Sequence, residues 1–152
     1  MFDTGNILYC QNFEFDDGGP SKTKYFIVLK HDGNDLIVGS LPTRKNKVPN
    51  IIDVEHGCVN DDERRINCYV FQAKKAICDN GFCFDLPTFV YGDAIRIQDA
   101  KIINSRYILN KNYTFEGKLS GSEFNALLKC FSNSDSVKNK IKRLLPSLKE
   151  SV

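Results

Sequence analysis

The pattern of apolar and polar positions predicts a chain built mainly from short β-strands. Its strongest signal lies at residues 24–43, where the runs Tyr25–Leu29 and Leu36–Leu41 flank the turn Asp32–Asp35. Both runs are rich in bulky, β-branched residues, which is typical of strands covered on both faces, so we expect the first run to be a central strand. Gly33 and Asn34 tolerate positive φ, so a short loop can reverse the chain between them.

The rest of the first hundred residues indicates a meander of further short strands. We predict strands near 5–15, 24–31, 35–42, 66–72 and 82–97, with shorter extended runs at 51–54, 76–78 and 101–103. Asn80-Gly81 is a typical hairpin turn within this region. Short strands separated by turn residues are the pattern of a small, strongly bent antiparallel barrel.

The last thirty residues change to a helical pattern. Ser120 to Glu123 matches a capping box, and an apolar stripe with helical spacing follows it. We predict helices near 121–131 and 136–147, the second disturbed in its last turn by Pro146. The fold expected is therefore mainly β with C-terminal helices, in a single domain of residues 1–152. Its barrel would cover about 5–115, and its helical part about 120–148.

Length and composition agree with one globular domain. The chain has 152 residues, of which 41% are hydrophobic and 26% charged. Its first residues lack a basic and then apolar leader, and no apolar run approaches membrane-spanning length. We therefore expect a cytoplasmic protein that does not engage a membrane.

The cysteines are expected to be reduced, because nothing marks the chain for export and most of them lie in strand-like runs. Their spacings are not those of a zinc ribbon, and only two histidines are available to complete a site. We therefore expect neither a metal nor another cofactor. The six cysteines are Cys10, Cys58, Cys68, Cys78, Cys83 and Cys130.

The net charge of +2 is unevenly distributed. Residues 1–100 hold 11 Lys and Arg against 15 Asp and Glu, whereas residues 101–152 hold 10 against 4. A basic C-terminal end is compatible with a polyanionic partner, although a solvated helix face explains it equally well.

Several cations lie at the connections between predicted strands. Lys22 and Lys24 reach the edge of the central hairpin, and the basic loop 44–47 follows its second strand. Arg64 and Arg65 stand at the entrance to strand 66–72, where guanidinium groups can fork onto phosphate oxygens. The acidic residues before these arginines offer the alternative that they are simply neutralised.

His56 ends the apolar run 51–54 and is the candidate for proton transfer. An imidazole exchanges protons near neutral pH, so His56 is suited to act as a general acid or base. A lone loop histidine is also a common structural residue, so both interpretations stay open.

Four stretches together resemble the PemK/MazF family of toxin endoribonucleases, which share a small SH3-like barrel with attached helices. They are Gly5–Leu8 with the polar loop 16–20, Lys24–Leu29, Ser40–Thr43 and Val70–Lys74.

The resemblance implies metal-independent cleavage of single-stranded RNA, in which the ribose 2′-OH attacks the adjacent phosphate. This reaction needs a base, an acid and a cation for the developing charge. Thr43 would orient the phosphate, His56 would move protons, and Arg44, Arg64 or Arg65 would stabilise the phosphorane. The residues expected to bind RNA are Lys22, Lys24, Lys45, Arg65, Tyr69, Gln72 and Lys74. A cognate antitoxin and a second copy of the chain are further partners implied by the family.

Some positions depart from the family pattern. Asn6 replaces an acidic residue, Phe71 stands in place of a carboxylate, and strand 66–71 carries no arginine. These departures favour the alternative of a non-catalytic SH3-like module that binds a protein or a nucleic acid. A purely structural interaction protein is a third hypothesis.

Overall fold

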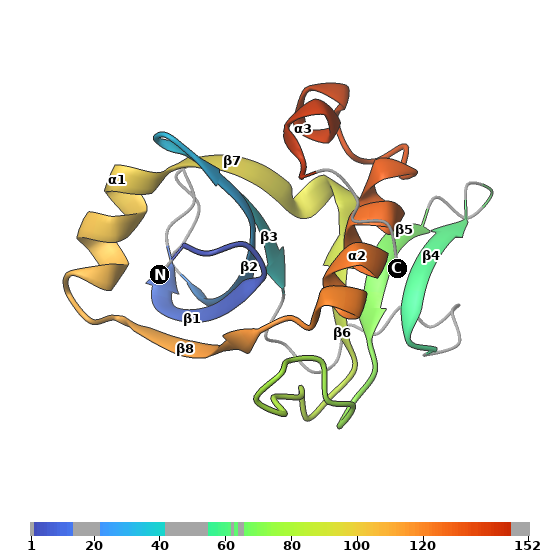
Figure 1. Ribbon diagram of the computed structural model, residues 1–152, viewed down its shortest axis with the longest axis horizontal. Coiled ribbons are helices and arrows are strands. Elements are labelled where there is room, and N and C mark those ends of the chain that lie inside the picture. The colour runs from blue at the N-terminus through green and yellow to red at the C-terminus, as the bar shows by residue number, and fades with distance from the viewer. Residues whose placement is uncertain (1, 14–21, 42–54, 62, 64–65, 147–152) are drawn as a thin grey trace.

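The computed structural model describes residues 2–13, 22–41, 55–61, 63 and 66–146, with the backbone alone at 11–13 and 22–24. Within these residues the strands form two antiparallel sheets (Figure 1). The larger sheet has the order β7(Ile95–Asp99), β3(Asp35–Leu41), β2(Lys22–Asp32), β1(Asn6–Phe13), β8(Tyr113–Lys118). The smaller sheet has the order β4(Gly57–Asp61), β5(Ile66–Phe71), β6(Thr88–Tyr91).

The hairpin of β2 and β3 occupies the centre of the larger sheet, as the sequence predicts. β2 lies between β1 and β3, and Phe26–Leu29 are buried. Alternate side chains of β2 enter two different cores, since Ile27 joins one hydrophobic cluster and Val28 another. Gly33 adopts φ 59° at the turn, a conformation that costs glycine little. Two-sided burial therefore accounts for the uninterrupted apolar pattern of this strand.

Antiparallel sheets with C-terminal helices are confirmed, but in the described residues the predicted strongly bent barrel is not closed. The larger sheet is strongly curved but ends at β7 and β8, and β4–β6 form a separate sheet. The predicted strand 82–97 is divided between the two sheets, because the short 3₁₀ turn Gly92–Ala94 separates β6 from β7. This turn carries the chain from one sheet to the other.

A helix replaces the extended run predicted at 101–103. α1(Ala100–Ile103) continues into the π-helical turn η2(Asn104–Ile108), and Ile103 and Tyr107 are buried against the larger sheet. Asp99 begins this helix, because its Oδ1 accepts hydrogen bonds from the N–H groups of Lys101 (2.9 Å) and Ile102 (3.2 Å).

The two C-terminal helices pack differently, since α2 contacts the smaller sheet and α3 contacts β7 of the larger sheet. α2(Gly121–Ser132) matches the predicted helix 121–131 and packs on β4 and β5 (Figure 1). Its apolar stripe is buried, with Leu127, Leu128 and Phe131 at most 1% exposed. α3(Asn139–Leu144) is shorter than the predicted 136–147, because Lys138 and Leu145 at its two ends have extended backbone.

The expectation that all six cysteines are reduced is wrong. Cys58 on β4 and Cys130 on α2 form a disulfide with their Cα atoms 5.4 Å apart. Cys58 lies opposite Tyr69 in the β4–β5 register, on the face that α2 covers. The sequence separation of 72 residues hides this proximity. The free cysteines are Cys10, Cys68 and Cys78, all buried, and Cys83, which is partly exposed.

Candidate functional site

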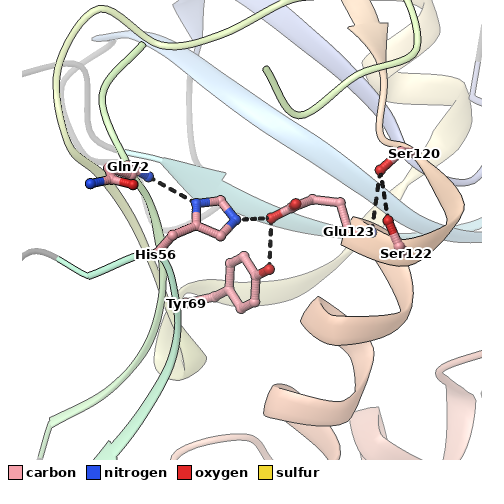
Figure 2. Close-up of polar contacts among 6 residues, drawn as sticks. All are labelled: His56, Tyr69, Gln72, Ser120, Ser122 and Glu123. Carbon is pink, nitrogen blue, oxygen red and sulfur yellow. Dashed lines mark hydrogen bonds and ion pairs between the residues drawn. The ribbon is translucent and has the colours of Figure 1, made fainter. Parts of the chain in front are cut away.

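A polar junction joins the smaller sheet to the first turn of α2 (Figure 2). Glu123 lies at its centre, where Oε1 contacts Nε2 of His56 and accepts a 2.7 Å hydrogen bond from the hydroxyl of Tyr69. The backbone N–H of Gln72 donates to Nδ1 of His56 over 3.1 Å. Three residues expected from the sequence to act on RNA, namely His56, Tyr69 and Gln72, are thus brought together.

The capping box explains how Glu123 becomes available to this junction. Ser120 Oγ accepts a hydrogen bond from the Glu123 N–H (3.3 Å), which is one half of the capping box. The Ser120 N–H instead donates to the carbonyl of Ile77 over 3.0 Å. The Glu123 carboxylate is therefore not needed at the helix start and extends toward His56 and Tyr69.

The hydrogen bonds of His56 determine what its ring can do. Because Nδ1 accepts from a backbone N–H, the proton of the neutral ring is on Nε2, which donates to Glu123. Both side chains are largely buried, with 13% of His56 and 12% of Glu123 exposed. A general base needs a lone pair directed at the substrate, and the Nδ1 lone pair is directed at an amide hydrogen. In this geometry His56 is a structural link.

Tyr69 lies in the interior of the junction. It is 2% exposed and makes edge-on ring contacts with His56 and Phe71, at centroid distances of 5.8 and 5.1 Å. Burial, and then the hydrogen bond to Glu123, raise the pKa of Tyr69, so its hydroxyl remains a donor. A ring that stacks on RNA bases must reach solvent, and Tyr69 does not.

Contacts between β4 and α2 continue beyond the junction, and we call the whole set the β4–α2 seam. It is formed by His56, Cys58 and Asn60 on one side and by Glu123 and Cys130 on the other. Besides the junction and the disulfide, Asn60 Nδ2 donates to the carbonyl of Cys130 over 3.4 Å. The seam therefore attaches one strand to one helix by a polar contact at each end and a covalent bond between them.

The turn after β5 displays residues that the sequence assigns to RNA binding. Gln72, Lys74 and Lys75 are exposed. Lys74 has φ 60°, and its N–H donates to the carbonyl of Phe84 over 2.7 Å. Left-handed backbone costs a residue with a side chain ~1–2 kcal/mol, so it persists only where surrounding contacts impose it. Gln72–Lys75 is therefore a fixed turn with two ammonium groups on the surface.

Next to this turn lies what we call the aromatic row, formed by Tyr9, Tyr25, Phe82 and Phe84. Its ring centroids are 4.5 Å apart for Tyr9 and Tyr25, 5.2 Å for Tyr25 and Phe84, and 5.1 Å for Phe82 and Phe84. Phe84 is buried, while the other three rings are partly exposed. Burial, and then the charge of Glu116, raise the pKa of Tyr25, which therefore stays neutral at physiological pH.

Other predicted site residues lie where the structure gives no side-chain description. Thr43, Arg44, Lys45, Arg64 and Arg65 fall outside the described residues. Lys22 and Lys24 belong to β2, where their backbones pair with Phe13 and Cys10. Sequence reasoning missed Glu123 as a site residue, because it assigned the carboxylate to the helix cap. The sequence feature that could have found Glu123 is the capping box, because it places this carboxylate in the first turn of α2.

Comparison with family models and with curated sequences identifies no relative of this chain. The chain matches no protein-family model and no curated protein sequence. In the described part of the chain, no three His, Cys, Asp or Glu side chains gather as a metal site. Over the same residues, no helix has both the length and the apolar character to span a membrane.

Proposed function

We propose that this protein binds single-stranded RNA through the Gln72–Lys75 turn and the aromatic row, as a module in which His56 is structural. The observation that carries the proposal is the fixed turn with two exposed lysines beside partly exposed rings. Single-stranded RNA is bound by cations that contact phosphates and by aromatic side chains on which bases stack. The turn offers the first group and the row the second.

Two further observations support RNA as the partner. Gln72 and Lys74, which the PemK/MazF resemblance associates with RNA, are both on the surface. The C-terminal third is also strongly basic, with exposed lysines such as Lys138 and Lys140. Excess positive charge attracts a polyanion over a longer range and favours its encounter with the turn.

A pair of charge-matched double variants tests the turn. Fluorescence anisotropy with a labelled single-stranded RNA would compare Lys74→Gln/Lys75→Gln with Lys138→Gln/Lys140→Gln at several salt concentrations. Each phosphate contact contributes ~0.7 to the steepness with which log K falls against log salt. If both turn lysines contact phosphates, the first variant should therefore reduce this steepness by about 1.4. The Lys138→Gln/Lys140→Gln variant should change the steepness less. Equal losses would show that net charge alone drives binding and would overturn the proposed surface.

The aromatic row has its own test. Tyr25→Leu removes a stacking ring, and Tyr91→Leu, which alters a partly buried tyrosine of the smaller sheet, is the matched control. Stacking of one base is worth ~1–3 kcal/mol, so Tyr25→Leu should weaken RNA binding roughly 5-fold to 150-fold. Unchanged affinity would remove the row from the interface.

A second candidate function is the metal-independent endoribonuclease implied by the resemblance. It is favoured by the carboxylate–imidazole pair of Glu123 and His56, since a carboxylate commonly orients the histidine of a general acid–base site. The reaction would require Nδ1 to leave the Gln72 N–H. An antitoxin protein and a homodimer belong to this candidate as partners, and the cytoplasm as its location.

A cleavage assay separates the two candidates. Long single-stranded RNA would be incubated with wild type, His56→Ala and Arg64→Ala in the presence of a metal chelator. Loss of one proton-transfer group or cation should slow cleavage ~10²-fold or more. Cleavage that survives both substitutions would exclude these residues from the site. RNA binding without cleavage would leave the binding module as the function.

A further inference from the structure

β4 depends on the β4–α2 seam more than on hydrophobic burial. It is an edge strand in the order β4-β5-β6, and none of its five residues is fully buried. Of its side chains, Val59 is the one that joins a hydrophobic cluster, as a partly buried member. An edge strand with little buried apolar surface has a low free energy of local opening. With so little apolar burial, the ladder with β5 and the seam are important to its attachment.

The disulfide is accessible from one side. Cys58 is exposed, whereas Cys130 is 2% exposed. We propose that Cys58–Cys130 is a redox latch, and that its reduction by a dithiol releases β4 and His56 locally while the larger sheet stays folded. The proposal concerns the seam and does not rest on RNA binding.

The reduction proceeds by thiol–disulfide exchange. A thiolate of the dithiol attacks Sγ of Cys58, which forms a mixed disulfide and expels Cys130 as a thiolate that takes up a proton. The second thiol of the reductant then attacks the mixed disulfide and releases Cys58. The protein gains two electrons and two protons, and the reductant leaves as its own disulfide.

Once the bond is broken, the contacts left in the seam are the long hydrogen bond from Asn60 and the contact between His56 and Glu123. The larger sheet has its own central hairpin, and no strand of the smaller sheet belongs to it. Opening of β4 would also separate the His56 ring from Glu123 and from the Gln72 N–H. The latch would thus control whether His56 has a free lone pair.

Hydrogen–deuterium exchange on the full chain tests the latch. Exchange would be measured by mass spectrometry on the oxidised protein, on the protein reduced with dithiothreitol, and on Cys58→Ala. We expect β4 to exchange at least ~10-fold faster after reduction or in Cys58→Ala, with β2 and β3 unchanged. Cys83→Ala, which removes a free thiol outside the seam, is the matched control and should behave as oxidised wild type.

Three results would overturn the latch. Titration of six free thiols in protein purified without reductant would show that the bond does not form. Unchanged exchange in β4 after complete reduction would show that the bond does not hold the strand. Equal acceleration in β4 and in β2 would show a staple of the whole fold. If Cys58→Ala fails to fold, reduction of wild type provides the same comparison.

Discussion

Replacing Glu123 by alanine removes the acceptor at the centre of the polar junction. The Tyr69 hydroxyl, on a residue only 2% exposed, would be left without a partner, which costs ~1–3 kcal/mol. His56 is 13% exposed, so water replaces part of its lost contact, at a cost of ~0.5–1.5 kcal/mol. Together these losses predict about 3 kcal/mol, which is roughly 10 °C in Tm for a chain of this size.

A double-mutant cycle with Tyr69→Phe makes the prediction specific to the junction. Tyr69→Phe removes only the hydroxyl, so in the Glu123→Ala background it relieves an unpaired donor. The two changes should therefore be less than additive, with a coupling free energy of ~1–2 kcal/mol. Urea denaturation of the two single variants, the double variant and wild type, followed by circular dichroism, measures this coupling.

Glu55→Ala is the matched control, because Glu55 is an exposed carboxylate next to His56 in the sequence. It should change the free energy of unfolding by less than ~0.5 kcal/mol. If Glu123→Ala were as mild as Glu55→Ala, the junction would not stabilise the protein and the structural role of His56 would be refuted. An additive cycle would show that the hydrogen bond between Tyr69 and Glu123 does not contribute.

Three further predictions concern other parts of the fold. Hydrogen bonds from the Asn34 side chain and then from the Ile102 N–H lower the pKa of Asp99 from its usual 3.8, so the stability that they add is present above that value and is lost as pH falls through the folded pKa. In a plot of the urea midpoint against pH, Asp99→Asn should therefore reduce the fall of the midpoint at acid pH. An unchanged fall would contradict this. Burial raises the pKa of Cys10 to about 12. Iodoacetamide added to the folded protein at pH 8 should therefore label the partly exposed Cys83 and spare Cys10, as measured by peptide mapping. Rapid labelling of Cys10 would show that it is not buried. Lys111 has φ 56° and is exposed, so Lys111→Gly should stabilise the protein by about 1 kcal/mol in urea denaturation, and a destabilised variant would argue against the left-handed turn.

The sequence determined the features that depend on neighbours in the chain. The apolar runs around Gly33-Asn34 predicted the central hairpin, because a strand covered on both faces needs no polar alternation. Ser120 and the apolar stripe after it predicted α2 to within one residue, because capping and helical periodicity are local properties. His56 was a candidate from its type and its place at the end of an apolar run, and Gln72 from the family resemblance; their roles in a site stay predictions.

Only the tertiary structure decided how these pieces meet. The apolar pattern of 82–97 shows which side chains seek burial, but the turn at Gly92 assigns β6 and β7 to different sheets. The disulfide joins residues 72 positions apart, and its proximity arises only when α2 packs on β4. Glu123 became the centre of the junction because the Ser120 N–H found the Ile77 carbonyl instead. Local patterns specify which groups need partners, whereas long-range packing selects the partner that each group receives.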